Sequence, residues 1–354
     1  MLMKRRKSRT VRIGKVAIGG KNPIAIQSMT KTSTSNVNAT INQIRALEEA
    51  NCQIIRLAVP DRKAAECLKL IKKEIKTPLV ADIHFDYKLA LIAIDAGIDK
   101  LRINPGNIGE KWKIKEVVTA AKQNKVPIRI GINAGSLEKD LLKKYHYPTA
   151  KAMVQSALRH IHLLEDNDFA DIVISMKAND IERTVEAYRL IASKVDYPLH
   201  LGITEAGTYF AGSIKSSIGI GLLLYEGIGD TIRVSLSADA VEEVKVGFEI
   251  VRALRLRNVE PVIIACPSCG RAEIDVQKIA HEVEERMKGI KNPLQIAIMG
   301  CVVNGPGEAR EADIGITGGK AVGLIFKKGK LFKRAAENEL VDELLNEIHK
   351  MIKT

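Results

Sequence analysis

Three of the five cysteines of this chain lie in two short segments, rich in glycine and proline, near its C-terminal end. Cys266 and Cys269 are separated by two residues, so a tight turn can direct both thiolates at one metal centre, and Cys301 supplies a third thiolate. Zinc sites and ordinary iron–sulfur clusters take a fourth ligand, for which Glu308 is the obvious donor. Because catalytic metal sites keep one position open, a weakly held fourth ligand indicates contact with substrate.

A Cys-x-x-Cys pair alone is more typical of a structural zinc site or a redox disulfide. Here no His-x-x-x-His pair follows and no second Cys-x-x-Cys exists, while the segment after Cys301 is rich in glycine. These features favour an iron–sulfur cluster. The other two cysteines, Cys52 and Cys67, lie in apolar patterns, where a free thiol usually behaves as a small buried hydrophobe.

Length and composition are typical of a globular protein with two domains. The 354 residues are 46% hydrophobic and 27% charged, which excludes a disordered chain. No apolar run reaches membrane-spanning length and no signal-peptide core follows the basic N-terminus, so we expect a cytoplasmic protein, not bound to a membrane, with reduced thiols. The net charge of +13 predicts an anionic partner: nucleic acid, a phosphorylated metabolite or an acidic protein. Only 4% of residues are aromatic and no dense basic run follows the first seven residues, which argues against nucleic acid.

Between Pro23 and Leu254 the chain alternates short apolar runs with helical patterns eight times. This alternation predicts the α/β class and a (β/α)8 TIM barrel. A doubly wound open sheet is the runner-up, but it rarely has eight regular units, and no Gly-x-Gly-x-x-Gly follows the first strand. The predicted strands are Ile24–Met29, Ile54–Val59, Leu79–His84, Lys100–Asn104, Ile128–Asn133, Asp171–Lys177, Leu199–Thr204 and Thr231–Ser235.

Polar side chains end nearly every predicted strand, and the C-terminal strand ends of such barrels form the catalytic mouth. Five of them are cations: Arg56, Arg102, Arg129, Lys177 and Arg233. Their mutual repulsion is tolerable only around a multiply charged anion, and guanidinium forks suit phosphate oxygens, so a diphosphate is the simplest ligand. The other polar positions are Gln27, Asp82, His84, Asn104, Asn133, Ser175, Thr204, Glu205 and Ser235.

Glu205 is the one carboxylate that this pattern places deep among the cations. It either neutralises a neighbouring arginine or donates a proton to a departing oxygen. Asp82 and His84, two residues apart on one strand, share a face of that strand. They either orient hydroxyl groups of the ligand or form a local structural pair.

A second, small α/β domain follows the barrel. We place the boundary near Pro261, which predicts a barrel domain of residues 1–257 and a cluster domain of residues 258–354. The latter should present its cysteines and Glu308 on loops at one edge of a sheet. Its predicted elements are a strand Val262–Ala265, a helix Asp275–Lys288, a strand Leu294–Met299, two short strands around Gly315 and Gly323, and a helix from Asn338.

Four segments carry a resemblance that covers the whole chain: Leu101–Ile108, Ile128–Ser136, Leu199–Gly207 and Gly300–Glu308. The chain resembles the bacterial two-domain (E)-4-hydroxy-3-methylbut-2-enyl diphosphate synthases of the methylerythritol phosphate route to isoprenoids. The resemblance implies a 4Fe-4S cluster held by Cys266, Cys269, Cys301 and Glu308. It also implies a substrate site at the barrel mouth, containing the arginines, Lys177 and Glu205. No insert interrupts the barrel, unlike in the plant-type enzymes.

The implied reaction is reductive ring opening and dehydroxylation of 2-C-methyl-D-erythritol 2,4-cyclodiphosphate, with two electrons from flavodoxin or ferredoxin. Glu308 would yield its place to a substrate oxygen, and Glu205 would supply a proton as oxygen leaves as water. The helix of the eighth unit, about Val241 to Leu254, should end opposite the mouth, and a linker of roughly six residues reaches only about 20 Å. The simplest solution is a two-fold dimer in which each cluster domain caps the partner's barrel, and the resemblance also implies such a head-to-tail homodimer. Two alternatives stay open: an iron–sulfur reductase of another phosphorylated substrate, and a non-catalytic metal- or RNA-binding protein.

Overall fold

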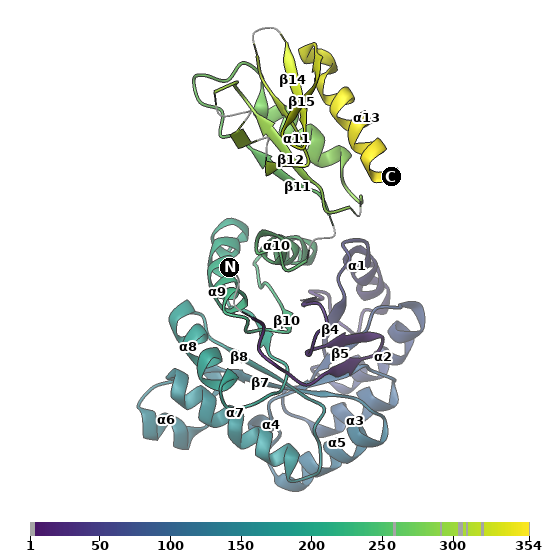
Figure 1. Ribbon diagram of the computed structural model, residues 1–354. Coiled ribbons are helices and arrows are strands. Elements are labelled where there is room, and N and C mark those ends of the chain that lie inside the picture. The colour runs from purple at the N-terminus through teal and green to yellow at the C-terminus, as the bar shows by residue number, and fades with distance from the viewer. Residues whose placement is uncertain are drawn as a thin grey trace. The chain divides into compact units, whose positions relative to one another are not determined.

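The computed structural model describes residues 4–257, 260–290, 292–303, 307–308, 311–319 and 322–353. The chain forms two compact units, Met1–Leu256 and Arg257–Thr354 (Figure 1). The expected boundary, between residues 257 and 258, lies one residue from this division. In the described part of the chain, no helix is both long and apolar enough to cross a membrane.

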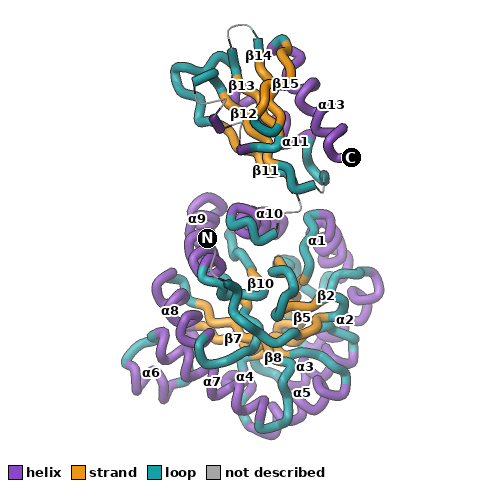
Figure 2. Tube along the Cα trace, viewed as in Figure 1, coloured by secondary structure: helices purple, strands orange, loops and turns teal. Residues whose placement is uncertain are grey.

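The first unit is a parallel barrel, as predicted. Its eight strands pair in the order β8-β7-β6-β5-β4-β3-β10-β9, and a parallel bridge between Ile174 and Leu199 joins β8 to the residue before β9. Figure 2 shows these strands inside a ring of helices. The strands are β3 (Ala25–Met29), β4 (Ile54–Ala58), β5 (Leu79–Asp82), β6 (Lys100–Ile103), β7 (Ile128–Asn133), β8 (Ile172–Lys177), β9 (His200–Leu201) and β10 (Thr231–Ile232).

The outer helices form where apolar residues recur every three or four positions. In α1 the buried positions include Ile41, Ile44 and Leu47, as the sequence pattern predicts. Asp or Asn side chains cap several helix starts, as Asp61 does by accepting from the backbone N–H of Ala64. The helices are α1 (Val37–Glu49), α2 (Arg62–Glu74), α3 (Tyr87–Asp95), α5 (Lys111–Gln123), α7 (Ala150–Glu165), α8 (Ile181–Ala192), α9 (Tyr209–Tyr225) and α10 (Ala240–Ala253), with short α4 (Pro105–Ile108), η1 (Ala134–Ser136) and α6 (Lys139–Tyr145) in the loops.

An N-terminal hairpin that the sequence analysis did not predict covers one end of the barrel. It comprises β1 (Val11–Ile13) and β2 (Val16–Ile18), and its buried side chains pack on first residues of barrel strands such as Ala25 and Ile54. The hairpin therefore closes the N-terminal end and leaves the catalytic chemistry to the opposite, C-terminal end.

The basic residues that precede this hairpin are part of the fold. Arg5 forms an ion pair with Asp230 at 3.0 Å, and Arg6 donates to the backbone carbonyls of Val195 and Tyr197 at 2.5 Å each. Because these guanidinium groups are already bound, the N-terminal basic run does not form a free arm for nucleic acid.

The second unit is a five-stranded sheet in the order β11-β12-β13-β14-β15, in which β11, β12 and β13 are parallel and the last two strands antiparallel. Side chains of two helices, including Val283 and Leu344, form a common core with the sheet residues Ile298 and Ile316. The sequence analysis anticipated every one of these elements except β15. The elements are β11 (Val262–Ala265), α11 (Val276–Arg286), β12 (Gln295–Met299), β13 (Ile314–Thr317), β14 (Gly323–Lys327), β15 (Lys330–Ala335) and α13 (Leu340–Lys353), with a 3-10 turn at Glu337–Glu339.

Candidate active site

The five predicted cations lie within electrostatic range of one another. The expected position at a strand end is wrong for two of them, because Arg129 is the second residue of β7 and Arg56 the third of β4. The pKa of Lys177 is lowered far below its usual value, first by burial and then by four surrounding arginines. Burial likewise lowers the pKa of Arg56 to about 10 and that of Arg129 well below its usual value. The arginines around Lys177 are Arg233, Arg129, Arg56 and Arg102.

Asp82 holds two of these arginines. Its carboxylate lies 3.0 Å from an Nη1 of Arg102 and 3.5 Å from Nε of Arg56, with His84 Nε2 at 3.6 Å. Burial alone would raise the pKa of Asp82, but Arg56, His84 and Arg102 together lower it below its usual value. Asp82 is therefore an anion that compensates the barrel cations, and the predicted closeness of Asp82 to His84 is present.

Gly131 on β7 makes room for the Arg102 side chain. A Cβ at this position would lie 2.4 Å from Nε of Arg102 and 2.9 Å from its Nη2. Contacts under 3 Å to a buried side chain cannot be relieved without moving it. The side chain of Arg102 thus depends on a glycine in the neighbouring strand.

We expect Gly131→Ala to displace Arg102 from Asp82 and to raise the KM for substrate about 10- to 100-fold, as the loss of a charge-assisted hydrogen bond of about 1.5–3 kcal/mol predicts. Steady-state kinetics measure this. Gly221→Ala is the matched control, because a Cβ there meets nothing within 4 Å. An unchanged KM in Gly131→Ala would show that Arg102 does not need its observed position.

Glu243 on α10 is a second buried carboxylate, which the sequence analysis missed. It accepts hydrogen bonds from Ser28 Oγ at 2.9 Å and from the backbone N–H of Leu236 at 3.1 Å. It also lies 3.5 Å from both Arg233 Nη2 and Lys31 Nζ. The available signal was an acidic residue among the apolar positions of the last barrel helix.

Arg129 and Lys177 form the uncompensated centre of the cation cluster. Arg129 is 1% exposed and Lys177 is 6% exposed. Within the described residues, Nε and Nη1 of Arg129 and Nζ of Lys177 have no hydrogen-bond partner. Buried donors without partners cost free energy, so this arrangement is suited to an anion that accepts from both side chains.

Lys177 occupies a gap where β8 and β9 separate. A Cβ on Gly202 would lie 2.7 Å from Lys177 Nζ. Tyr188 on α8 spans this gap, since its hydroxyl donates to the carbonyl of His200 at 2.5 Å and accepts from the N–H of Met176 at 3.0 Å. The backbone bonds that the strands lack here are therefore supplied by one buried side chain.

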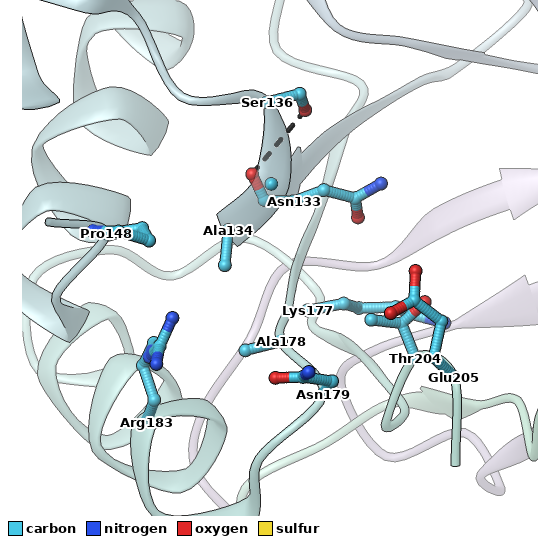
Figure 3. Close-up of a pocket in the computed structure, with 11 residues that line it drawn as sticks. Asn133, Ala134, Ser136, Pro148, Lys177, Ala178, Asn179, Arg183, Thr204 and Glu205 are labelled. Atoms are coloured by element: carbon cyan, nitrogen blue, oxygen red, sulfur yellow. Dashed lines mark hydrogen bonds between the residues drawn. The ribbon is translucent and has the colours of Figure 1, made fainter. Parts of the chain in front are cut away.

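A pocket of ≈ 450 Å³ opens beside Lys177 (Figure 3). Figure 3 shows Lys177 directed towards the segment that carries Thr204 and Glu205, and Arg183 reaching in from its helix. Arg183 was not predicted; it pairs with Asp180 at 3.2 Å. The pocket is lined by Asn133, Ala134, Gly135, Ser136, Pro148, Lys177, Ala178, Asn179, Arg183, Thr204 and Glu205.

Glu205 differs from its expected placement. Its side chain is exposed, and its backbone adopts a left-handed φ of 52°. The expectation of one carboxylate deep among the cations is wrong for Glu205, because Asp82 and Glu243 occupy the buried positions. The strand predicted to run to Thr204 ends at Leu201, so Glu205 lies on the loop at the pocket rim.

The other predicted mouth residues differ in burial and in their hydrogen-bond partners. Asn104 is buried and caps α4 by accepting from the N–H of Gly106 at 3.2 Å. Ser175 donates to the carbonyl of Ile130 at 3.4 Å, and Gln27 lies inside the barrel, where it accepts from Lys100 at 3.3 Å. Asn133 and Ser235 are partly exposed near the mouth. Local bonds thus account for Ser175 and Gln27 without a ligand, while the side-chain oxygen of Asn104 serves as a helix cap.

The predicted cluster ligands lie in the second unit. Cys266 follows β11 and Cys301 follows β12, and these strands are adjacent and parallel, so their C-terminal ends share one edge of the sheet. The Arg271 side chain hydrogen-bonds Cys269 and lies in electrostatic range of Cys301 and Cys266. All three thiols are free.

The donor set of three thiolates and one carboxylate fits an iron–sulfur cluster by its chemistry. Among the residues that the structure describes, no three His, Cys, Asp or Glu side chains are placed to hold one ion. A cluster instead offers separate irons to thiolates around it. Glu308 is exposed, while Asn304, Gly305 and Pro306 of the predicted signature lie outside the described residues. Cys52 is inert as expected, because burial raises its pKa to about 12.

Comparison with known proteins agrees with both units. The GcpE TIM-barrel domain model matches residues 8–248, and the GcpE protein C-terminal domain model matches residues 262–350. Among solved structures, dihydropteroate synthase from Stenotrophomonas maltophilia aligns with 70% of this chain and 98% of its own, at a TM-score of 0.53 and 14% identity. That likeness supports the barrel fold alone.

Two curated relatives match along nearly the whole chain, and both are named 4-hydroxy-3-methylbut-2-en-1-yl diphosphate synthase (flavodoxin). The protein from Caldanaerobacter subterraneus is 60% identical over 353 residues, which is 100% of this chain and 99% of the relative. The protein from Symbiobacterium thermophilum is 59% identical over 344 residues, 97% of this chain and 93% of the relative. With a matching barrel domain, a matching C-terminal domain and relatives of this identity, the chain belongs to the GcpE family.

Proposed function

We propose that this protein reduces 2-C-methyl-D-erythritol 2,4-cyclodiphosphate to (E)-4-hydroxy-3-methylbut-2-enyl diphosphate, opening the ring and removing a hydroxyl group, in isoprenoid biosynthesis in the cytoplasm. The two electrons come from flavodoxin or ferredoxin. The observation that carries the proposal is a pair of buried cations inside the barrel: Nε and Nη1 of Arg129 and Nζ of Lys177 have no hydrogen-bond partner among the described residues. The relatives at about 60% identity carry the name of this synthase.

The cyclic diphosphate binds among the mouth cations. Arg129 and Lys177 donate to its phosphate oxygens, because their buried nitrogens have no partner among the described residues. Arg56, Arg102 and Arg233 are held around them by the two buried carboxylates, which limits the repulsion before the anion arrives. Side chains fixed in this way pay little orientation cost when the substrate binds. Asn104, Asn133, His84 and Ser235 complete the proposed substrate contacts.

The reaction consumes two electrons and one proton and releases one water per substrate. Glu205 is the proposed proton donor, since its carboxyl group lies at the rim of the pocket that contains Lys177. Its exposure allows it to take a new proton from solvent after each turnover.

Cys266, Cys269, Cys301 and Glu308 are the proposed ligands of a 4Fe-4S cluster. When bound, such a cluster supplies electrons one at a time and a Lewis-acidic iron at its non-thiolate corner. Thiolates are suited to iron–sulfur ligation, and a carboxylate is the harder and more readily exchanged ligand. Cys266 and Cys301 emerge from neighbouring strand ends, which is the placement that a shared cluster needs.

The test is product formation by protein purified without oxygen. Loaded with iron and sulfide and given the cyclodiphosphate and reduced methyl viologen, it should form the linear diphosphate, measured by mass spectrometry. Cys301→Ser should lose both the iron and the product. A fully loaded protein that forms no product would contradict the proposed substrate, and an iron-free native protein would contradict the cluster.

A head-to-tail homodimer is proposed as the working assembly. Helix α10 runs back from the loop after β10 and ends at Ala253, at the N-terminal end of the barrel strands, and β11 begins at Val262. So short a connection makes it hard for the cluster of one chain to reach its own barrel mouth. Each cluster domain therefore serves the barrel of its partner chain.

Two inactive chains should then restore each other. Glu205→Gln retains the cluster ligands and Cys301→Ser retains the barrel, so a mixed dimer contains one site with both parts intact. Random assembly should return up to about a quarter of normal activity on co-expression. The assay compares each variant alone with the purified mixed dimer. No recovery from a mixed dimer that carries its one cluster would contradict the shared site.

Salt should slow the reaction with a protein donor. The chain carries a net charge of +13, and electron donors such as flavodoxin are typically acidic, so their encounter is steered by charge over about 8 Å at physiological ionic strength. Rates with flavodoxin should fall as salt rises, while rates with a small neutral reductant should not. An equal response of both rates would place the salt effect at the substrate site instead.

A further inference from the structure

The cluster domain is nearly neutral, but its cations are concentrated in one hairpin. Residues 257–354 contain 15 Lys and Arg and 14 Asp and Glu, so nearly all of the +13 net charge belongs to the barrel. Five of the 15 cations fall within residues 327–334, which contain no acidic residue. These eight residues are the last residue of β14, the two-residue turn after it and the first five residues of β15. A partner attracted to the cluster domain must therefore respond to a local charge rather than to the charge of the domain.

The helix α13 neutralises two of the five cations. Lys327 Nζ lies 2.5 Å from a carboxylate oxygen of Glu347, and Lys333 Nζ lies 2.6 Å from one of Glu343. Both lysines thus face the helix-covered side of the sheet. Their charges are compensated within the domain and add little to its outer field.

The other three cations are exposed and lie beside exposed apolar side chains. Lys328, Lys330 and Arg334 have no ion-pair partner within the described residues. Leu331 is 50% exposed and Phe332 is 51% exposed. We call these five residues the β15 patch. Three free cations around two apolar side chains form a surface that suits an anionic protein with an apolar contact area.

The register of the sheet aligns one end of the β15 patch with the cysteine segment. Arg334 lies opposite Leu324, Leu324 opposite Thr317, and Thr317 opposite Met299, which precedes Cys301 by two residues. Three steps between neighbouring strands, at about 4.8 Å each, span about 14 Å. The patch is thus on the same small domain as the proposed cluster and extends towards it.

Arg334 also lies on the same face of the sheet as Met299, the residue two positions before Cys301. Residues directly opposite each other in adjacent strands point to the same face, so Arg334 shares the face of Met299. A register shift between Ile325 and Phe326 places Leu331 opposite Phe326. Phe326 and Met299 belong to the apolar cluster against which Cys266 packs. Leu331 and Arg334 therefore lie on the face of Met299, whose cluster Cys266 contacts. Lys330, opposite Lys327, lies on the helix-covered side, and the centroid of the Phe332 ring is 5.4 Å from Lys327 Nζ. The β15 patch thus spans both sides of this edge strand.

We propose that the β15 patch is the docking surface for the acidic electron-transfer protein that reduces this enzyme. The proposal rests on the proposed function and names the surface that its electron donor uses. Lysines on an edge strand also prevent edge-to-edge pairing of sheets. That role explains the cations of β15, but it does not explain two half-exposed apolar side chains between them.

The test reverses the free charges of the patch. In Lys328→Glu/Lys330→Glu/Arg334→Glu, we expect the KM for purified bacterial flavodoxin at low ionic strength to rise about tenfold or more, because steering and rim pairing are both lost. The rate with reduced methyl viologen should stay at the wild-type value, since these residues touch neither substrate nor cluster ligands.

The matched control makes the same change of net charge on the barrel. Lys63→Glu/Lys69→Glu/Lys73→Glu alters three exposed lysines of α2 and should leave the flavodoxin KM within about twofold of the wild-type value. Equal effects of the two triple variants, or no effect of the patch variant, would overturn the proposal.

A second variant probes the apolar part of the patch. Phe332→Ser should raise the flavodoxin KM several-fold without changing the salt dependence, and an unchanged KM would remove Phe332 from the interface. If wild-type protein itself fails with methyl viologen, the proposed function is contradicted rather than the docking surface. Binding of oxidised flavodoxin to the cluster-loaded protein, measured by calorimetry, then still decides the docking surface on its own.

Discussion

Replacing Lys177 by Met should weaken binding of the cyclodiphosphate by roughly 30- to 5,000-fold, the range expected from about 2–5 kcal/mol for truncating one partner of a buried, hydrogen-bonded charge pair. The reason is that Lys177 Nζ is buried and has no hydrogen-bond partner in the described part of the chain. An anion that accepts from it gains a charge-assisted hydrogen bond at a buried nitrogen. Isothermal titration calorimetry of the protein without reductant measures the affinity.

Lys100→Met is the matched control. Lys100 is also fully buried, and burial followed by Arg129 and Arg56 lowers its pKa. It differs from Lys177 because its Nζ already has an acceptor, Gln27 Oε1 at 3.3 Å. The same loss of a buried ammonium group there should leave the affinity near that of the wild type. Equal losses in both variants would show that the net charge of the barrel matters, and not a contact with Lys177.

The same titration reports the protonation of Lys177. Burial and then the neighbouring arginines lower its pKa in the free protein, and a bound diphosphate should raise it again. A group whose pKa rises on binding takes up a proton, so affinity should fall as the pH rises through the pKa of the free state. Heats measured in buffers of different ionisation enthalpy should show proton uptake for the wild type and less for Lys177→Met.

Glu308→Cys should keep an iron–sulfur cluster and reduce turnover to background. A thiolate binds iron more firmly than a carboxylate does, so a fourth cysteine should close the position that the substrate needs. Glu308 is exposed, which leaves space for such an exchange. Iron and sulfide content and the absorption spectrum report the cluster, and product formation reports turnover.

Glu311→Cys provides the control for an added thiol. Glu311 is exposed and three residues from Glu308, so its replacement introduces the same side chain in the same segment without occupying the proposed ligand position. It should retain both cluster and activity. A fully active Glu308→Cys enzyme would show that displacement of this ligand is unnecessary.

Regular local patterns accounted for most of the fold. The strand predicted at Ile128–Asn133 is β7 without change, and that predicted at Val262–Ala265 is β11, because β-branched residues recur in both segments and favour extended backbone. The edge strand β15 escaped prediction since five of its six residues are exposed and its pattern is not alternating. The β1–β2 hairpin escaped because strands of three residues leave little pattern.

Strand ends were predicted less well than strand centres. The strand expected at Leu199–Thr204 forms ladder pairs only at His200 and Leu201. Beyond them the backbone at Gly202 passes close to the carbonyl of Arg233, at a distance of 2.5 Å from a hypothetical Cβ, and departs from the ladder. Glu205 therefore lies on a loop. Its exposure depends on this departure, which no periodicity in the sequence records.

The sequence by itself determined that five cations lie on the barrel strands or directly after them, and that Cys266 and Cys301 follow neighbouring parallel strands of the second sheet. It did so because chain direction and strand order place such residues before any packing is known. Only the tertiary structure decided how those charges are compensated. Glu243 receives a hydrogen bond from Ser28, 215 residues away, and lies beside Arg233, so the pairing depends on closure of the barrel. That closure leaves nitrogens of Arg129 and Lys177 buried without hydrogen-bond partners among the described residues, and from this arrangement we infer an anion site.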